Sequence, residues 1–380
     1  MNNRRTDNEN RVVQIIRVIL GLVFIFSSFM KGIDPMGTAY RVEDYLLAYS
    51  MDWLYELSFV LAVFLIVIEF LLGIALIFKL RYKLATLGVL LIMVFFTIVT
   101  YFDANYNLVP DCGCFGDAIK LSNWSTFYKN IVLIIMAIIV FFTRKSNASS
   151  LPNWLQNTVL LLFVGGFTWF IFYNLNHLPV IDFRDWKIGN DMRSSGEENA
   201  KTYVIYKNKT TGEVKEYLSP EYPWNDTVWL KEWEFVDQRF DDSGVIQNHN
   251  VFIEDSEGND FTKHIIENPD YQIILTTYDL ETANSGGMIK ASELFQSLRY
   301  DDVSFVLLSS SGSDIIDNFK EVYQMDYEVY FADDVELKAM IRSNPGLLLM
   351  HNEVVLEKWH YNDFPDPSEM EDVITRELTE

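Results

Sequence analysis

Five long apolar stretches lie in the first 173 residues of the chain. Each is close to the roughly 20 residues that an α-helix needs to cross a bilayer, so the pattern predicts five membrane-spanning helices and excludes a wholly soluble protein. The fourth is the shortest, and Lys129 near its start would have to extend its amine to the membrane interface. The stretches are residues 12–30, 57–78, 84–102, 127–142 and 154–173.

After residue 200 the pattern changes to short segments typical of strands. Residues 202–208 and 213–218 alternate around a glycine-containing loop, which predicts a β-hairpin. Residues 251–254 and 260–262 indicate a second hairpin. The tryptophans between the hairpins, which we expect to pack this small β-rich module rather than to bind a ligand, are Trp224, Trp229 and Trp233.

From residue 271 strand-like and helix-like segments alternate and end in a hairpin, which is typical of an α/β layered domain with a mixed sheet. This order is similar to the thioredoxin-like fold, in which a proline precedes the closing hairpin. Pro345 stands at that place. We expect the Asn344–Pro345 bond to be cis, because only X–Pro bonds adopt that form at modest cost. The predicted strands are 271–278, 303–308, 328–331, 347–350 and 354–359, and the predicted helices are 289–298, 315–323 and 335–341.

The thioredoxin-like segment departs from its fold family where the chemistry is expected. Members of that family carry a Cys-x-x-Cys pair at the head of the first helix, whereas residues 278–287 contain no cysteine. A thiolate is the nucleophile in disulfide exchange. We therefore expect this domain to bind, dock or shield a partner rather than to react itself.

These patterns divide the chain into four parts. A segment rich in Asp, Asn, Gly and Ser reads as a linker between the membrane part and the soluble part. About 200 residues outside the membrane are enough for one or two folded domains. The parts are a five-span membrane domain (1–176), the linker (177–200), a small β-rich module (201–262) and a thioredoxin-like domain (263–380).

The charges of the two halves differ strongly. Residues 1–180 contain 13 Lys and Arg against 11 Asp and Glu, and residues 181–380 contain 17 against 42. The acidity behind the formal net charge of −23 therefore lies in the second half. Such a soluble part argues against a nucleic-acid partner, because phosphate binding relies on Lys and Arg.

The Lys and Arg residues of the short loops predict the orientation, since loops rich in them stay in the cytoplasm. The N-terminus and the loops after spans two and four are basic, whereas the loops after spans one and three are acidic. Five crossings from a cytoplasmic N-terminus place the C-terminal domain outside the cytoplasm, in the periplasm if the spans lie in a bacterial inner membrane. A cleaved signal peptide fits poorly, because residues 12–30 are too long and end without a small-residue cleavage site.

The chain has two cysteines, Cys112 and Cys114, in one loop after the third span. The predicted topology places this loop on the oxidising side, where disulfides persist, and Gly113 permits the backbone angles of a very small ring. We interpret the pair as redox-active, because a bridge across so few residues stabilises little. An inert turn and soft-metal binding stay open, although no His or further Cys gives a metal-site spacing. The flanking Asp111 and Asp117 disfavour a thiolate.

The first span and the cysteine loop resemble known membrane proteins. The opening of the DoxX-like proteins is similar to Arg17-x2-Leu20-Gly21-x2-Phe24-x2-Ser27-x3-Lys31-x2-Asp34-Pro35-x-Gly37, with Tyr45 later, and the loop of their methylamine-utilisation (MauE-type) branch is similar to Cys112-Gly113-Cys114-Phe115-Gly116. The resemblance covers residues 11–145. It implies a four-helix membrane bundle, to which the fifth span is an addition, and a part in extracytoplasmic thiol–disulfide chemistry or in maturation of a partner protein. The chain has no second cysteine pair to pass electrons onward.

Three charged residues within or near the spans are further candidates. Glu69 lies centrally in the second span, where an ionised carboxylate is costly and is by default a functional hypothesis, such as proton transfer or contact with a quinone as cofactor. The alternative is a protonated Glu69 that is hydrogen-bonded to a neighbouring helix. Arg17 and Lys31 lie near the ends of the first span, and we interpret them as interface anchors. The candidate partners of Glu69 are Ser27, Ser28, Thr97 and Thr100.

Two function hypotheses follow. In the first, an accessory protein of the bacterial inner membrane exchanges disulfides with an envelope protein client through Cys112 and Cys114, as a thiol–disulfide oxidoreductase, while the cysteine-free domain holds the client. In the second, the chain is a non-enzymatic structural or assembly subunit of an envelope complex, and the cysteines are incidental. A small-molecule transporter is disfavoured, because the spans show no inverted repeat. The expected partners are the lipid bilayer and an envelope protein; no metal is expected.

Overall fold

The computed structural model describes residues 10–109, 112–144, 151–193, 201–223, 226–241, 248–298, 303–323 and 327–377. The chain forms two compact units that divide between Arg184 and Asp185. The first, called the membrane unit below, contains the long apolar helices. The second, called the soluble unit, contains two β-sheets and shorter helices.

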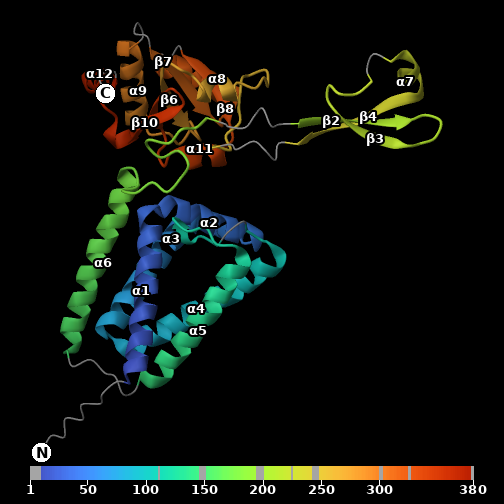
Figure 1. Ribbon diagram of the computed structural model, residues 1–380. Coiled ribbons are helices and arrows are strands. Elements are labelled where there is room, and N and C mark those ends of the chain that lie inside the picture. The colour runs from blue at the N-terminus through green and yellow to red at the C-terminus, as the bar shows by residue number, and fades with distance from the viewer. Residues whose placement is uncertain are drawn as a thin grey trace, which may run out of the picture. The chain divides into compact units, whose positions relative to one another are not determined.

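Five helices of the membrane unit are long and apolar enough to span a bilayer. They confirm the five predicted spans, including the short fourth one. The helices extend beyond the apolar stretches because polar residues at their ends continue the helical hydrogen bonding. Figure 1 shows α1 (Arg11–Ile33), α3 (Ser58–Phe78), α4 (Tyr82–Tyr106), α5 (Asn123–Thr143) and α6 (Asn153–Asn176).

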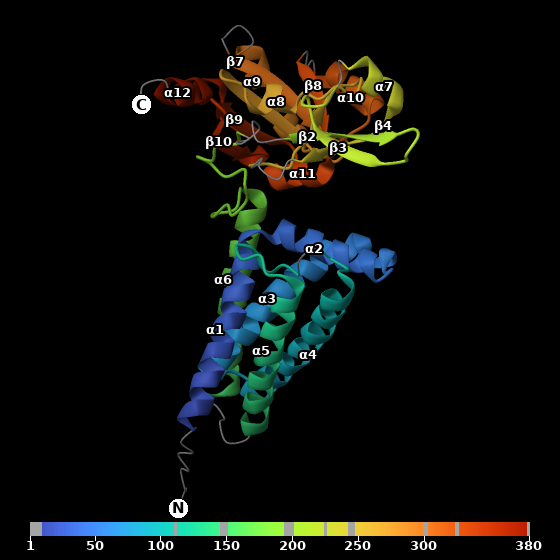
Figure 2. The ribbon, with the colours of Figure 1, turned by 45° about the vertical axis from the view of Figure 1, so that its right-hand side comes forward.

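A further helix, α2 (Pro35–Ala48), lies across one end of the bundle (Figure 2). The sequence analysis did not predict it. Asp34 caps its N-terminus by accepting a hydrogen bond from the Gly37 amide, and Pro35 stands at the start, where its missing N–H costs nothing. A 3₁₀ helix, η1 (Asp52–Leu57), leads into α3, and the loop between α4 and α5 contains a short strand, β1 (Cys114–Asp117).

Close backbone contact and stacked rings hold the membrane unit together. A methyl group at Gly73 on α3 would lie 2.9 Å from the Gly21 carbonyl oxygen on α1, so both positions require a residue without a side chain. Small residues at such contacts let membrane helices approach each other closely. The fifth span, α6, packs on the bundle through Phe167, whose ring centroid is 3.9 Å from that of Phe70.

The larger sheet of the soluble unit has six strands in the order β10-β9-β6-β7-β8-β5. Strands β6, β7 and β8 are parallel, whereas β9 and β10 form an antiparallel hairpin beside β6. The β6-α9-β7 unit, followed by this hairpin and α12, is a thioredoxin-like arrangement. The Asn344–Pro345 bond that leads into β9 is cis, the form expected for it. The elements are β5 (Ile253–Glu254), α8 (Thr262–Ile266), β6 (Tyr271–Thr277), α9 (Ser285–Leu298), β7 (Val303–Ser309), α10 (Ser313–Tyr323), β8 (Glu328–Ala332), α11 (Asp334–Met340), β9 (Gly346–His351), β10 (Val354–His360), η4 (Tyr361–Asp363) and α12 (Pro367–Glu377).

The core of this sheet follows the alternation of its strands. Ile273 and Leu275 on β6 are fully buried and form one cluster with apolar residues of α9, α10 and α12. The residues between them, including Ile274, are also buried, so the central strand is covered on both faces. Burial on both faces agrees with a sequence of β-branched and aromatic residues that does not alternate strictly between apolar and polar.

The small sheet has the strand order β3-β2-β4. The antiparallel pairing of β2 with β3 confirms the predicted hairpin. Trp229 and Trp233 stack with ring centroids 6.0 Å apart, and the Tyr206 ring lies 4.7 Å from Trp229. These tryptophans pack within the module, while Trp224 lies outside the described residues. The elements are β2 (Lys201–Asn208), β3 (Val214–Leu218), α7 (Thr227–Glu232) and β4 (Trp233–Asp241).

Two segments differ from the predicted division of the chain. Residues 185–193 belong to the folded soluble unit rather than to a free linker, because Trp186 and Met192 are buried and Asp191 bridges to Val354 on β10. The second predicted hairpin is reduced to a single bridge between Glu254 and Asp260. Its first strand, β5, pairs with β8 instead and so joins the larger sheet.

We expect Gly73→Ala to destabilise the membrane unit, because the added methyl group would press on the backbone of α1. The expected loss is about 1–3 kcal/mol, as for other overpacked sites. Gly165→Ala on α6 is the matched control, since a methyl group there meets nothing within 4 Å. Thermal unfolding of the purified protein in detergent should separate the two variants. Equal melting temperatures would contradict the close contact of α1 with α3.

Candidate functional site

Cys112 and Cys114 are joined by a disulfide at the end of the bundle where α2 lies. Their α-carbons are 5.4 Å apart, within the usual range of about 4.4–6.8 Å. The ring requires Gly113 at φ +58°, a left-handed conformation that costs glycine little. A side chain at Gly113 would meet the Arg41 side chain of α2 at 3.0 Å, so the loop lies closely against that helix. Both cysteines are half-buried.

A serine of α1 connects the disulfide loop to the interior of the bundle. The Ser27 hydroxyl lies 2.7 Å from the Cys114 carbonyl oxygen and 3.1 Å from Glu69 Oε2. Phe115 packs on Phe26 of the same helix, with ring centroids 5.5 Å apart. Backbone and side chain together therefore fix the loop on α1.

Beneath the loop lies a buried ion pair. Lys31 Nζ on α1 is 2.8 Å and 3.0 Å from the two carboxylate oxygens of Glu69 on α3, and the side chains are 6% and 2% exposed. Two opposite charges in direct contact compensate each other where water is excluded. Glu69 therefore has the Lys31 amine as a partner as well as the Ser27 hydroxyl.

The interpretation of Lys31 and Arg17 as interface anchors is wrong. Arg17 is only 4% exposed, and its guanidinium donates to the carbonyl oxygens of Leu76 and Ile77 at distances of 2.5 and 2.8 Å. These carbonyls belong to the last turn of α3, where helices leave acceptors unsatisfied. Both basic side chains turn inward because α3 supplies hydrogen-bond acceptors for them. These acceptors cannot be inferred from the position of Arg17 and Lys31 along the first span.

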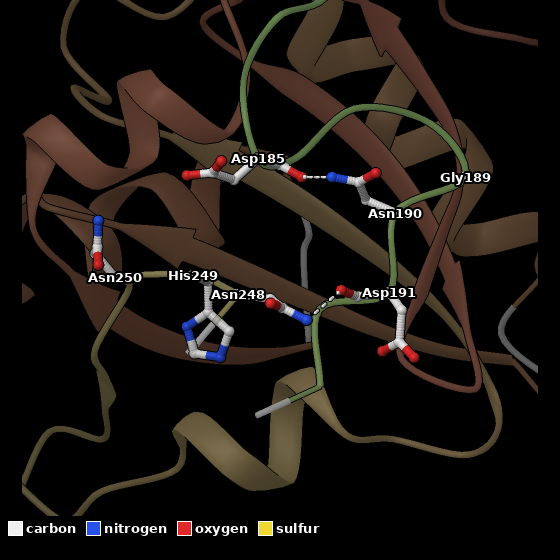
Figure 3. A pocket seen from close by; sticks show the side chains of 7 residues that line it. All are labelled: Asp185, Gly189, Asn190, Asp191, Asn248, His249 and Asn250. Atoms are coloured by element: carbon white, nitrogen blue, oxygen red, sulfur yellow. Dashed lines mark hydrogen bonds between the residues drawn. The ribbon is translucent and has the colours of Figure 1, made fainter. Parts of the chain in front are cut away.

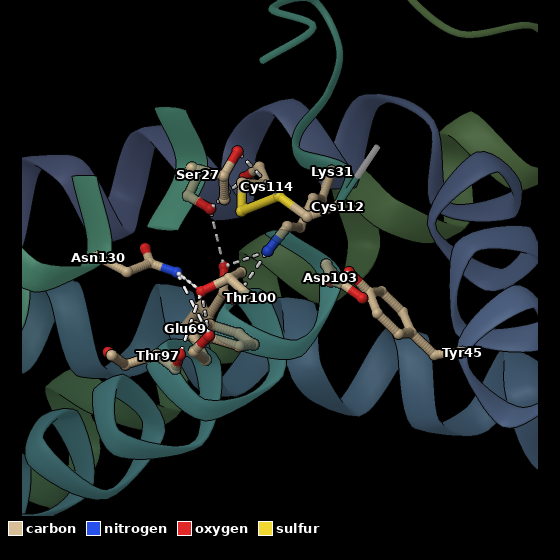
Figure 4. The surroundings of a disulfide bond; sticks show 12 residues. Ser27, Lys31, Tyr45, Glu69, Thr97, Thr100, Asp103, Cys112, Cys114 and Asn130 are labelled. Carbon is tan, nitrogen blue, oxygen red and sulfur yellow. Dashed lines mark hydrogen bonds and ion pairs between the residues drawn. A yellow bond between two sulfur atoms is a disulfide. The ribbon is translucent and has the colours of Figure 1, made fainter. Parts of the chain in front are cut away.

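A small cavity of about 30 Å³ lies between this ion pair and the disulfide. Figure 4 shows the side chains of Ser27, Lys31 and Glu69 meeting below Cys114. The space corresponds to about one or two water molecules. Its polar lining consists of Ser27, Lys31, Glu69, Cys114, Lys129 and Asn130.

Several of these residues escaped the sequence analysis. Of the four predicted partners of Glu69, only Ser27 bonds to it, since Ser28, Thr97 and Thr100 donate to carbonyls of their own helices. Lys31 could have been found from its spacing, because it lies four residues after Ser27 and so on the same face of α1. Asn130 carried no comparable signal, and Lys129 was noted only as a lysine that would extend its amine to the membrane interface, whereas it lines this cavity with its amine over the Phe115 ring.

A second buried carboxylate, Asp103, lies near the outer part of the same site. The Tyr45 hydroxyl of α2 donates to Asp103 Oδ2 at 2.7 Å, which connects α2 to α4. The sequence analysis placed Asp103 in a loop, whereas α4 extends past it to Tyr106 and leaves it fully buried. Its Oδ1 has no hydrogen-bond partner among the described residues.

The soluble unit has a polar cavity of about 390 Å³ (Figure 3). Two of its asparagines hold the segment 185–193 in place, since Asn190 donates to the Asp185 carbonyl at 2.7 Å and Asn248 to that of Asp191 at 3.0 Å. Burial lowers the pKa of His249, which also lines it. Within the described ranges, no group of three His, Cys, Asp or Glu side chains is placed to hold a metal ion.

Internal hydrogen bonds close the head of α9, where the thioredoxin-like fold family carries its cysteines. The Asn284 amide donates to the Asn344 carbonyl at 2.9 Å, and the Asn344 side chain donates to the Asp279 carbonyl at 2.7 Å. A methyl group at Gly287 would lie 3.1 Å from the ring of Pro345. This place holds no thiol, and these two hydrogen bonds join it to the segment before β9.

Residues 9–143 match the model of the family described as methylamine utilisation protein MauE. The membrane domain of this chain is therefore similar to the MauE family. The match includes both cysteines, the Lys31–Glu69 pair and α1 to α5. It ends before α6 and the soluble unit. Among curated proteins, none is similar enough to the chain to count as a relative.

Solved structures similar to the chain include a candidate protein disulfide isomerase from Bacteroides thetaiotaomicron and StoA from Bacillus subtilis. The first is 10% identical, with a TM-score of 0.28, and the likeness covers 35% of this chain and 88% of that one. The second is 11% identical, with a TM-score of 0.26, and the likeness covers 33% and 96%. Values this low say nothing about function, and the thioredoxin-like assignment of the soluble unit rests on its strand order.

We expect Glu69→Leu to destabilise the protein by about 3–5 kcal/mol, because it leaves the Lys31 ammonium buried without its partner. The double variant Lys31→Met with Glu69→Leu should recover most of this loss, since it removes both charges. Denaturant unfolding in detergent micelles, analysed as a double-mutant cycle, measures the coupling. Additive losses would show that the two side chains do not depend on each other.

Proposed function

We propose that this chain is a thiol–disulfide oxidoreductase of the bacterial inner membrane that exchanges its Cys112–Cys114 disulfide with an envelope protein. The observation that carries the proposal is the disulfide itself, which is half-buried at the end of a MauE-type bundle and lies against a cluster of charged residues. The MauE match supports a membrane-associated role in redox chemistry or protein maturation. The Cys112–Cys114 disulfide is the group that would react in such a role.

The course of the chain supports an extracytoplasmic soluble unit. The Asn174 side chain near the end of α6 donates to the Gly32 carbonyl at the end of α1, at 3.3 Å. Ser27, which contacts the disulfide loop, lies one turn away on α1. The last span therefore ends at the same end of the bundle as the disulfide. With the basic loops in the cytoplasm, both lie outside it.

The exchange balances in two steps. A client thiolate attacks one sulfur of the disulfide, forms a mixed disulfide and expels the other sulfur as a thiolate. A second client thiolate then attacks the client sulfur of the mixed disulfide and releases the remaining cysteine. The client loses two electrons and gains a disulfide, and Cys112 and Cys114 gain these electrons and, with two protons, become thiols.

The soluble unit holds the client in this proposal. The head of α9 has no thiol, and the buried Oδ1 of Asn344 there has no hydrogen-bond partner among the described residues, so it suits binding rather than exchange. This same observation favours the second candidate, an assembly subunit in which the cysteines are incidental. The two candidates differ in whether activity needs the sulfurs.

A reporter enzyme that is active only outside the cytoplasm should be active when it is fused after Glu380 and silent when it is fused at Lys145. The reason is that short loops rich in Lys and Arg stay in the cytoplasm, and the loop at Lys145 is such a loop. Activity assays on cells that carry each fusion measure this. The reverse pattern would place the disulfide in the reducing compartment and remove the basis of the proposal.

We expect Cys112→Ser, Cys114→Ser and the double variant to lose client oxidation completely, because each removes the disulfide. One single variant should hold the client as a mixed disulfide that gel electrophoresis without reductant detects. Protein abundance in the membrane serves as the control. Full activity of an abundant double variant would instead establish the assembly subunit.

A further inference from the structure

Lys129 is a cation inside the bundle without a carboxylate in contact. Its amine lies over the Phe115 ring, 4.5 Å from the centroid, and it forms no ion pair within the part of the chain that the structure describes. Lys129 lies on α5 and lines the same cavity as Lys31 and Glu69, which act on it electrostatically. An ammonium group at this depth is costly unless an anion or a ring compensates it.

The charges around the cavity do not cancel in the oxidised protein. Lys31 and Glu69 neutralise each other in direct contact, so the charge of Lys129 is the surplus. The disulfide is neutral and contributes nothing. Reduction of the disulfide would supply the missing negative charge if one of the two sulfurs became a thiolate at this place.

The two cysteine residues are not equivalent with respect to Lys129. Cys114 lines the cavity together with Lys129. It directly precedes Phe115, and the Lys129 amine lies over the Phe115 ring. Cys112 does not line the cavity, and its sulfur lies 3.6 Å from the Thr126 hydroxyl.

We propose that Lys129 is the counter-ion of a Cys114 thiolate, so that a client attacks Cys112 and Cys114 is the leaving group. This inference rests on the disulfide exchange proposed above and adds its direction. The client thiolate bonds to the Cys112 sulfur while the bond between the two cysteines breaks. The electron pair stays on the Cys114 sulfur, which becomes a thiolate beside the Lys129 ammonium group. The mixed disulfide is then held by Cys112.

Three other charged groups lie near the loop among the residues that the structure describes. Arg41 of α2, which touches Gly113, pairs with Asp44 at 3.1 Å. Asp103 of α4 accepts from Tyr45. Asp117 follows the loop on β1 and is half-buried. A carboxylate there opposes a thiolate, which makes a nearby ammonium group all the more necessary for one to form.

The test measures each thiolate without a client. The full-length protein in lipid nanodiscs is reduced and alkylated with iodoacetamide over a range of pH, and mass spectrometry follows Cys112 and Cys114 separately. In the wild type we expect the pH midpoint of Cys114 to lie about one unit or more below that of Cys112, as for thiols beside an ammonium group. Equal midpoints would overturn the inference, whatever the variants do.

Substitution of the lysine provides the second arm. Lys129→Gln should raise the midpoint of Cys114 by about one pH unit and leave that of Cys112 in place, and Lys129→Arg should restore it. Lys120→Gln is the matched control, because Lys120 is exposed and follows the same loop, so the midpoint should not move. A rise of the Cys114 midpoint in Lys120→Gln as large as in Lys129→Gln would overturn the role of Lys129.

Reduced glutathione, used as a simple thiol, tests the direction of attack. Oxidised protein that is quenched with acid soon after its addition should carry the adduct on Cys112 in several-fold excess. Excess on Cys114 would overturn the inference while client oxidation by the wild type still supported the proposed function. An adduct on Cys112 together with full activity of the double Ser variant would sustain the inference and refute the proposed function.

Discussion

A charge that is buried within a membrane helix bundle must find its opposite there, and the site depends on this constraint. Lys31 and Glu69 satisfy each other across α1 and α3. Ser27 joins the carboxylate of that pair to the backbone of the cysteine loop. The position of the disulfide is therefore determined from inside the bundle, by contacts that would be lost if either charge were removed. Ser27, Lys31 and Glu69 thus support the loop and also line the cavity next to it.

The close contact of α1 with α3 serves the same pair. Gly21 and Gly73 bring the two backbones together at one level, and Lys31 and Glu69 face each other at another level of the same two helices. A lysine and a glutamate form a direct ion pair only at short separation, as Lys31 and Glu69 do at 2.8 Å. Small residues at one level thus allow charged residues to meet at the next. The Arg17 guanidinium on α1 adds to this contact, because it donates hydrogen bonds to carbonyl oxygens in the last turn of α3.

Patterns that depend on length and period were predictable from the chain, and pairings between distant residues were not. The five spans follow from apolar length, and strand β6 from a run of β-branched and aromatic residues. The helix α2 was missed because its apolar face is short and interrupted by polar residues. Lys31 was misread because its position near the end of a span suggested the interface, whereas the partner that turns it inward lies 38 residues away. Likewise β5 joined the larger sheet through a strand that begins only at Glu328. Local sequence patterns cannot predict a partner that lies so far away along the chain.

The contact of Gly113 with Arg41 has a consequence for access to the two sulfurs. The loop lies against α2 on one side, through Gly113, and against α1 on another, through Ser27. In the exchange proposed above, an attacking thiolate would therefore approach the disulfide from the side that these two helices leave open.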